Sequence, residues 1–217
     1  KLIPILLFCL FGLHANAETY PEVVFDNSLV KGTYARSLVD YSGKSWVENV
    51  NKHLLVSDTL FFTPGNALSL RYLSHPQGDW NVTIRYSRQK FHYRLSNDDV
   101  LSFKLYVGSA STKAEHLPSI SIKQRNNQSV SLAIGNYIQG FKKGAWLDVR
   151  IPVKEFAGLN VEEHISGIIL RQLNDSKSTH QLFLDQTDAV AVNVSEFIEF
   201  GTELIGDIFN ILKVRWH

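Results

Sequence analysis

The carboxylates are the residues of this chain best suited to chemistry, because two of them at a defined separation can cleave a glycosidic bond. Three positions offer carboxylates: Asp98–Asp99, Glu162–Glu163 and Glu48. Adjacent carboxylates on a strand point to opposite faces of the sheet, so Asp98 and Asp99 cannot act together there. Glu162 and Glu163 fall in a polar loop. We therefore expect no catalytic residues.

Other catalytic and metal-binding patterns are missing from the sequence. The 8 histidines show no H-x-H or H-E-x-x-H spacing, and neither a G-x-S-x-G turn nor a phosphate-binding glycine loop occurs. Cys9 is the single cysteine and lies in the leader described below, which excludes thiol catalysis and cysteine-based zinc sites. We expect this chain not to be an enzyme.

Short strands are the elements that would position any functional side chain. Two alternating stretches, 68–73 and 80–86, are separated by a turn rich in breaker residues, 75–79. Strand patterns recur, without intervening helical patterns, over 22–27, 99–107, 119–123, 129–134, 144–152, 167–172 and 180–185. Such a series is typical of an all-β sandwich or jelly roll. We expect residues 28–59 to form long loops with one strand near 35–40.

Alternation also sorts the side chains into a buried set and an exposed set, because successive residues of a strand face opposite sides. The residues predicted to face inward are Leu68, Leu70, Val82, Ile84, Leu101, Phe103, Ile120, Ile122, Leu147, Val149, Ile168 and Leu170. Those predicted to face outward are Arg71, Arg85, Lys104, Tyr106, Lys123, Arg125, Arg150 and Arg171.

The charge balance and the leader bear on partners and location. Lys and Arg number 22 against 21 Asp and Glu, which gives no argument for nucleic acid as a partner. Residues 1–17 combine Lys1, an apolar run and the cleavage pattern at 15–17, which predicts a signal peptide. The run is too short for an ordinary transmembrane helix. We expect an exported protein, periplasmic, on the outer cell surface or extracellular, with no transmembrane span after signal cleavage.

Residues 187–217 differ from the strand-rich part and form a helical tail or a truncated linker to a missing domain. The apolar residues fall on one helical stripe: Val194, Phe197, Ile198, Leu204, Ile205, Ile208, Phe209 and Leu212. The polar face is acidic, which weakens the case for membrane contact. Such a helix would lie on the sandwich or dock a further domain.

Six motifs, in this order, resemble a known family: VFDNSL (24–29), GNALSLRY (65–72), GDW (78–80), DDVLSF (98–103), WLDVRIP (146–152) and LFLD (182–185). They are similar to the N-terminal carbohydrate-binding-module-like, galactose-binding-like jelly roll of secreted bacterial glucoamylase-like glycoside hydrolases. The resemblance covers residues 22–186. It implies a poly- or oligosaccharide partner, followed in the parent chain by a fibronectin-like domain and a catalytic helical barrel.

The same resemblance implies a structural calcium ion. In this fold the ion ties the first strand, the turn before the G-x-A strand and the last strand together. The matching positions here are Asp26, Asn66 and Asp185. Calcium takes six to eight oxygen ligands, which carboxylates and turn carbonyls supply. The alternative is that Asp26 and Asp185 only cap strand ends through hydrogen bonds.

A carbohydrate surface would combine aromatic rings, which pack on sugar C–H faces, with polar groups that bind hydroxyls. The residues predicted to form it are Arg71, Trp80, Tyr93, Tyr106, Arg125 and Arg171. Mid-strand Lys and Arg could equally form the ordinary solvated face of a sandwich. We interpret Trp80 and Trp146 as core residues more readily than as platforms, and a truly cationic groove would instead favour an anionic polysaccharide.

Three functions remain open from the sequence. The first is a non-catalytic carbohydrate-binding-like module of an exported glycan-degrading protein. The second is a fragment of a glucoamylase-like, glucan-degrading glycoside hydrolase whose catalytic domain lies downstream and for which this module is structural. The third is a cell-surface interaction module that uses the acidic terminal helix.

Overall fold

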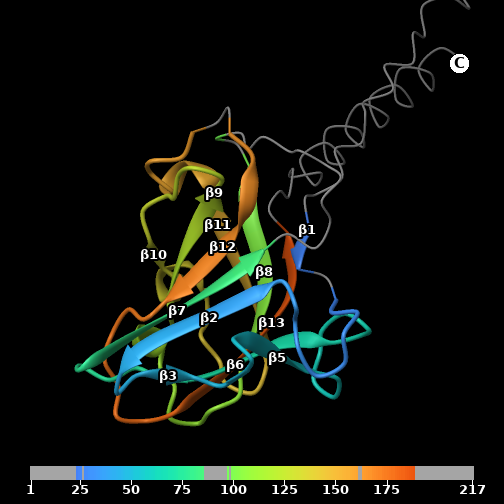
Figure 1. Cartoon of the computed structure of the whole chain (residues 1–217), viewed down its shortest axis with the longest axis vertical. Helices are drawn as coiled ribbons and strands as arrows, with labels where there is room; N and C mark the ends of the chain where they lie inside the picture. Colours follow the sequence, from blue (N-terminus) through green and yellow to red (C-terminus); the bar gives the residue numbers. More distant parts are fainter. Residues whose placement is uncertain (1–22, 26, 86–96, 98, 161–162, 189–217) are drawn as a thin grey trace, which may run out of the picture.

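The protein is a sandwich of two antiparallel β-sheets in a computed structural model (Figure 1). The structure describes residues 23–25, 27–85, 97, 99–160 and 163–188. Within these residues the helical elements are three short 3₁₀ turns: η1 (Ala114–His116), η2 (Ile134–Tyr137) and η3 (Val153–Glu155). The predicted all-β sandwich is confirmed.

The larger sheet, sheet A, has the strand order β11-β8-β13-β6-β5-β4, with β1 paired to β13 and β3 paired to β6. Its strands are β1 (Val23–Phe25), β3 (Trp46–Val47), β4 (Asn49–Val50), β5 (His53–Ser57), β6 (Ala67–Leu73), β8 (Val100–Val107), β11 (Trp146–Pro152) and β13 (His180–Asp188). Pro152 ends β11 at the edge of this sheet, where the missing N–H removes no central ladder bond.

The smaller sheet, sheet B, has the order β10-β9-β12-β7-β2. Its strands are β2 (Ser37–Gly43), β7 (Gly78–Arg85), β9 (Ser119–Gln124), β10 (Leu132–Ala133) and β12 (Ile165–Arg171). The predicted hairpin of 119–134 is present, but its second strand is short, because only residues 132 and 133 pair with β9.

The core lies between the two sheets, and every residue predicted from alternation to face inward is buried there. Trp80 and Tyr72 are among the largest buried side chains, and their ring centroids are 4.8 Å apart. Alternation therefore predicted the packing of the sandwich correctly, because each sheet has one face in the core.

The prediction for residues 28–59 was wrong in part. This segment contains β2 to β5, of which the sequence indicated one strand. Three of these strands are short or irregular in burial, so they carry little period-two signal. Their pairing with β6 and β5 holds them in place instead.

The first and last described strands lie side by side, since Val23 pairs with Asp188. The predicted signal peptide, Asp26, Tyr93 and the helix predicted within 187–217 fall outside the described residues, apart from Thr187 and Asp188 in β13. Among the described residues, no helix is long and apolar enough to cross a membrane.

Candidate functional site: an aromatic face on sheet A

A row of aromatic side chains crosses the outer face of sheet A. Trp146 of β11 pairs with Tyr106 of β8, and Tyr106 pairs with Phe183 of β13. The ring centroids of Trp146 and Tyr106 are 5.5 Å apart, and those of Tyr106 and Phe183 are 6.0 Å apart. Each ring follows or precedes a buried residue of its strand, so parity turns all three away from the core. These rings, with Phe62, are called the aromatic face below.

The loop 61–65 folds over the same sheet and forms a wall beside the row. Phe62 is 44% exposed, and its ring centroid lies 5.9 Å from that of Trp146 in an edge-on arrangement. The buried carboxylate of Asp185 holds this loop, because its Oδ2 accepts hydrogen bonds from the backbone N–H of Phe62 at 2.7 Å and of Thr63 at 2.9 Å. Asp185 Oδ1 accepts a third from Gln186 at 2.7 Å. The carboxylate of Asp185 therefore fixes the position of loop 61–65 on sheet A.

The two cations that lie over aromatic rings of this sheet are each paired with a carboxylate. Lys104 Nζ lies 4.5 Å from the centroid of the Phe62 ring and forms an ion pair with Asp148. Arg71 lies over Trp46 and pairs with Glu48 at 3.6 Å. Arg150 is a further exposed residue of the same face, on β11. Because Lys104 and Arg71 are locally neutralised, this part of the surface favours uncharged ligands over anionic ones.

The residues predicted to bind carbohydrate are divided between the two sheets. Arg71 and Tyr106 lie on the outer face of sheet A. Arg125 and Arg171 belong to the sheet B side, where Arg171 donates to Gln128 Oε1 at 3.2 Å. Tyr93 lies outside the described residues. The six positions therefore do not form one described site.

Trp80 is a core residue, as the alternative interpretation had it. Its side chain is 1% exposed, and its Nε1–H donates to Ser74 Oγ at 3.0 Å. An indole so enclosed presents no face to a sugar. The sugar-platform role predicted for Trp80 is therefore wrong.

Sequence reasoning missed Trp146, Phe183 and Phe62. The interpretation of Trp146 as a core residue is wrong, because it shares the parity of exposed Asp148 and Arg150. The same alternation that placed Leu147 and Val149 inside already indicated this orientation. Phe183 could have been found in the same way, since it lies between buried Leu182 and Leu184. Phe62 lies in a loop and had no such signal.

Glu48 and Asp148, the carboxylates that pair with Arg71 and Lys104, cannot act as a catalytic pair with each other. Four strand-to-strand steps separate β11 from β3, which corresponds to roughly 15–20 Å. A carboxylate pair that cleaves a glycosidic bond spans no more than about 10 Å.

The segments predicted to hold calcium come together. Asn66 Nδ2 donates to Ser28 O at 3.0 Å, and Asn66 Oδ1 accepts from Ser28 N at 2.9 Å, so the turn before β6 is tied to the chain after β1. The hydroxyls of Thr63 and Thr187 are buried without a hydrogen-bond partner among the described residues. Together with Asp185 these hard oxygens fit calcium in donor type. Asp26 is outside the described residues, and the described part contains no group of three or more His, Cys, Asp or Glu that could hold a metal. The calcium ion stays a prediction.

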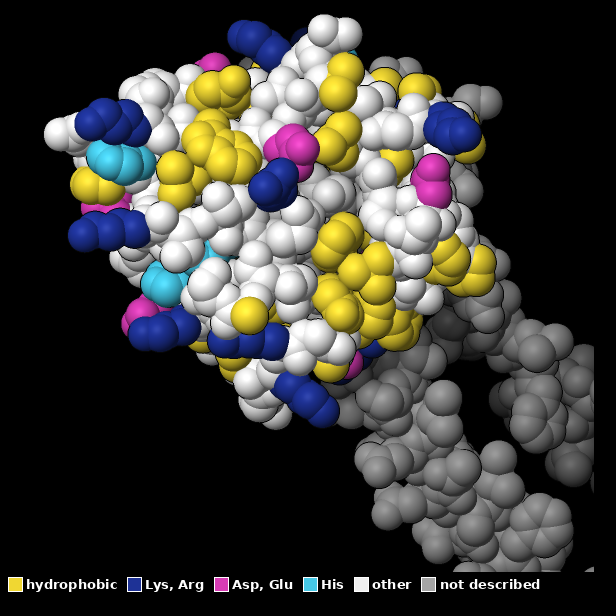
Figure 2. All heavy atoms as spheres, turned by 90° about the horizontal axis from the view of Figure 1, so that it is seen from below, with side chains coloured by type: hydrophobic (Ala, Val, Ile, Leu, Met, Phe, Trp, Pro, Cys, Tyr) yellow, Lys and Arg dark blue, Asp and Glu magenta, His cyan; other side chains and the backbone are white. Residues whose placement is uncertain are grey.

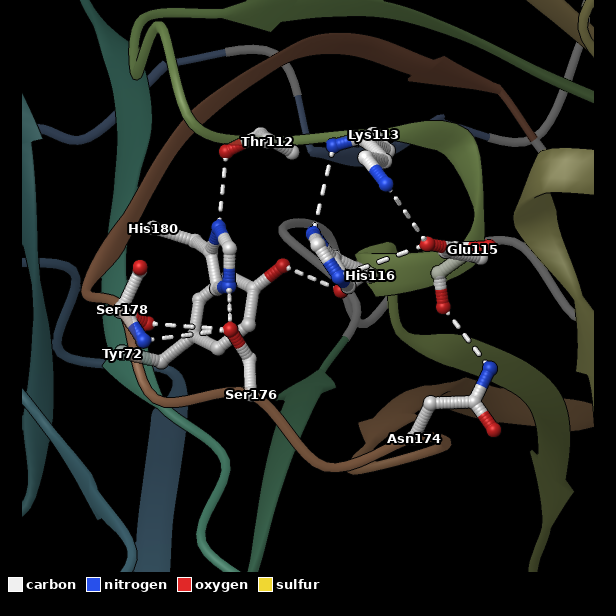
Figure 3. A network of polar contacts seen from close by, with 9 residues as sticks. All are labelled: Tyr72, Thr112, Lys113, Glu115, His116, Asn174, Ser176, Ser178 and His180. Atoms are coloured by element: carbon white, nitrogen blue, oxygen red, sulfur yellow. Dashed lines mark hydrogen bonds and ion pairs between the residues drawn. The ribbon is translucent and has the colours of Figure 1, made fainter.

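A polar cluster, separate from the aromatic face, surrounds His180 at the start of β13 (Figure 3). The ring of buried His180 is held by Thr112 Oγ1 at 2.8 Å from Nδ1 and by Ser176 Oγ at 2.7 Å from Nε2. His116 stacks at 4.9 Å between ring centroids, and its backbone oxygen accepts from the Tyr72 hydroxyl at 2.8 Å. Burial, and then the nearby charge of His116, lower the pKa of His180 to about 4. This histidine is neutral at physiological pH and ties two loops to β13.

The surface seen in Figure 2 carries hydrophobic side chains in patches, with Lys and Arg mostly toward its rim. No continuous basic surface appears in that view. This distribution agrees with the balanced composition of 22 Lys and Arg against 21 Asp and Glu.

No known protein-family model matches the sequence. The chain is similar to the exo beta-1,2-glucooligosaccharide sophorohydrolase (non-reducing end) of Parabacteroides distasonis, with 31% identity over 189 residues. The match covers 84% of this chain and 26% of that protein, so the chain spans about a quarter of the length of this relative.

Two kinds of solved structure are similar to the sandwich. A beta-1,2-glucanase from Parabacteroides distasonis has a TM-score of 0.73 at 30% identity, covering 80% of this chain and 26% of that one. The family 30 carbohydrate-binding module of a cellulosomal cellulase from Clostridium thermocellum has a TM-score of 0.62 at 14% identity, covering 80% of this chain and 99% of the module. The fold is therefore a carbohydrate-binding-module-like β-sandwich.

These similarities overturn two expectations from the sequence. We expected a non-catalytic module and a chain that is not an enzyme, yet 84% of the chain matches part of a sophorohydrolase at 31% identity. The absence of short catalytic motifs misled the prediction, because the similarity extends over a long alignment and includes none of the local signatures that were sought.

Proposed function

We propose that this chain is the β-sandwich part of a glycoside hydrolase that acts on beta-1,2-linked gluco-oligosaccharides. The observation that carries the proposal is the match of 84% of the chain, at 31% identity, to an exo beta-1,2-glucooligosaccharide sophorohydrolase. The TM-score of 0.73 to a beta-1,2-glucanase from the same organism supports it at the level of the fold. The glucoamylase-like helical barrel predicted from the motifs would belong to the three-quarters of the relative that this chain does not match.

The aromatic face of sheet A would contribute to holding the glucan. Glucose units present C–H faces that pack against rings such as those of Trp146, Tyr106 and Phe183, which stand in one row. The pairing of Lys104 with Asp148 supports a neutral glucan rather than an anionic one. Aromatic residues at the centre of an interface commonly contribute about 2 kcal/mol or more to binding.

Export and calcium belong to the same proposal. The signal peptide predicted at residues 1–17 supports secretion. Asp26, Asn66 and Asp185 would hold a calcium ion that ties the first strand, the turn before β6 and β13 together. The buried Thr63 and Thr187 hydroxyls, which have no hydrogen-bond partner among the described residues, would be further oxygen donors. Its contribution would be structural.

The test is a product assay with the natural protein that carries this sequence. We expect it to release sophorose from linear beta-1,2-gluco-oligosaccharides, as chromatography of the products would show. Beta-1,3- and beta-1,4-linked oligosaccharides of equal length serve as controls. Absence of any product from the beta-1,2-linked substrates, with a folded protein, would refute the proposal.

The role of the aromatic face is tested separately with Trp146→Ala. The matched control is Tyr41→Ala, an exposed aromatic residue of β2 on sheet B. We expect the first variant to raise the KM for long oligosaccharides and the second to leave it unchanged. Equal kinetics for Trp146→Ala and the unchanged protein would remove the aromatic face from the proposal.

A further inference from the structure

We infer that Trp46, Arg71 and Glu48 form a second sugar-binding station on the outer face of sheet A, separate from the aromatic face. The station would take one uncharged hexopyranose unit of a chain whose other units contact the aromatic face. This inference rests on the proposed function for the identity of the glucan. Its geometry comes from the short strand β3 and its neighbour β6.

The backbone places the three side chains on one face. Val47 of β3 is buried, so Trp46 before it and Glu48 after it are turned away from the core. On β6, buried Leu70 and Tyr72 flank Arg71, which also points outward. The N–H of Glu48 donates to Arg71 O at 2.8 Å, which fixes the two residues side by side.

The side chains form a contact that is ordered and yet open to solvent. The guanidinium carbon of Arg71 lies 5.9 Å from the centroid of the Trp46 ring, and an Arg71 nitrogen lies 3.6 Å from a Glu48 oxygen. The side chains of Arg71 and Glu48 remain 50% and 42% exposed. A surface ion pair of this kind contributes about 1 kcal/mol or less to the free energy of folding, so it is of little importance for stability.

These groups match the polar and apolar surfaces of a pyranose. The guanidinium donates through a planar fork, and the carboxylate accepts, so neighbouring hydroxyls of one sugar can bind both. The indole of Trp46 offers a ring for the C–H face. Because Glu48 neutralises Arg71, the station discriminates against uronic acids, which a lone arginine would attract.

The position of the station sets the length of ligand that reaches it. On β6, Arg71 pairs with Gln181 and Ser69 pairs with Phe183 of the aromatic face, so Arg71 lies two residues, or about 7 Å, along the sheet from that row. Trp46 lies one strand beyond β6, opposite Leu73. Gln181 Nε2 donates to Ser69 Oγ at 3.0 Å and forms a polar floor between them. A short oligosaccharide therefore contacts the aromatic face or the station, and a longer one contacts both.

The experiment measures affinity against ligand length by calorimetry, using the natural protein and linear, non-hydrolysable thio-linked analogues of beta-1,2-gluco-oligosaccharides of increasing length. For the unchanged protein we expect affinity to rise until both places are occupied. Trp46→Ala and Arg71→Ala should leave binding of the shortest ligand unchanged and weaken binding of the longest about tenfold, which corresponds to 1.4 kcal/mol. Tyr41→Ala is the matched aromatic control, and melting temperatures confirm that each variant folds.

The outcomes separate this inference from the proposed function. If the protein binds beta-1,2-glucans and Trp46→Ala weakens no ligand more than Tyr41→Ala does, the station is refuted and the function stands. If the protein binds only other neutral glucans, and Trp46→Ala abolishes the dependence of affinity on ligand length, the station is supported and the proposed beta-1,2 specificity is refuted. Failure to bind any neutral glucan overturns the station. Tighter binding of uronic acid polymers than of glucans would also overturn it.

Discussion

Acidification should destabilise this protein through His180, a buried histidine that the fold holds in its neutral form. Its two ring nitrogens face the hydroxyls of Thr112 and Ser176, and the rings of Tyr72 and His116 pack beside it (Figure 3). A hydroxyl can donate or accept, so both nitrogens of a neutral imidazole are satisfied. Protonation would place a charge inside this cluster. Lys113 and Glu115 lie at its outer side, against His116.

The sign and size of the effect follow from the pKa of His180, which burial, and then the charge of His116, lower from 6.5 to about 4. The unfolded chain binds this proton more readily than the folded one does. The stabilisation is therefore complete above pH 6.5 and is lost as the pH falls toward 4. A pKa shift of this size corresponds to a loss of about 3 kcal/mol in the free energy of unfolding once His180 is protonated. Screening by nearby solvent reduces it, so we expect a loss of about 2 kcal/mol.

The assay is urea unfolding at a series of pH values from 7.5 to about 4. His180→Gln retains hydrogen-bonding groups but cannot titrate, so its unfolding free energy should fall less over this range by about 2 kcal/mol. His75→Gln is the matched histidine-to-glutamine control, because His75 lies in the turn before β7, outside the His180 cluster. Parallel pH profiles for the unchanged protein and His180→Gln would refute the reasoning.

Three further predictions concern the aromatic face and its supports. Asp185→Ala should destabilise the protein by about 2–3 kcal/mol, because three backbone N–H groups lose their acceptor. Urea unfolding measures the loss of free energy. Amide hydrogen exchange that is faster at Phe62 and Thr63 than in the control Asp148→Ala would show that the loss arises in loop 61–65. Trp80→Ala should lower the free energy of unfolding by about 3–5 kcal/mol, because it leaves a cavity in the core. Trp146→Ala should lower it by less than about 1.5 kcal/mol. Equal losses would contradict a buried Trp80 and an outward-facing Trp146. Removing calcium with a chelator should lower the melting temperature of the unchanged protein and leave that of Asp185→Asn, which lacks a proposed calcium ligand, unchanged. A melting curve of the unchanged protein that does not respond to the chelator would exclude the ion.

Side-chain parity was the part of this protein that the sequence predicted well. Leu68 and Leu70 face the core and Arg71 faces outward because the period of a strand is two, which is a local property of the backbone. The same rule applied to 144–152 indicates an outward Trp146, which our interpretation of this residue as core overlooked. Composition sets one further limit, since a chain with the single cysteine Cys9 cannot form a disulfide within itself.

The grouping of outward residues into sites could not be predicted from parity. Tyr106 and Arg171 were assigned to one surface, yet they belong to different sheets, because strand order places β8 in sheet A and β12 in sheet B. The contact of Trp46 with Arg71 depends on a two-residue strand, β3, which is too short to show alternation. The expectation that the chain is not an enzyme was wrong, because it relied on the absence of short catalytic motifs, whereas the similarity to a sophorohydrolase extends over 189 aligned residues.

The sequence by itself determined that the chain folds as a β-sandwich, which residues fill its core and that no strong net charge directs it to nucleic acid. Those properties depend on composition and on neighbours along the chain. Only the tertiary structure decided that Trp146, Tyr106 and Phe183 stand in one row, and that Asp185 draws Phe62 over the sheet beside them. The row depends on the register of strands that are distant in the sequence, and the position of Phe62 depends on a hydrogen bond between residues more than a hundred positions apart. No local pattern records either.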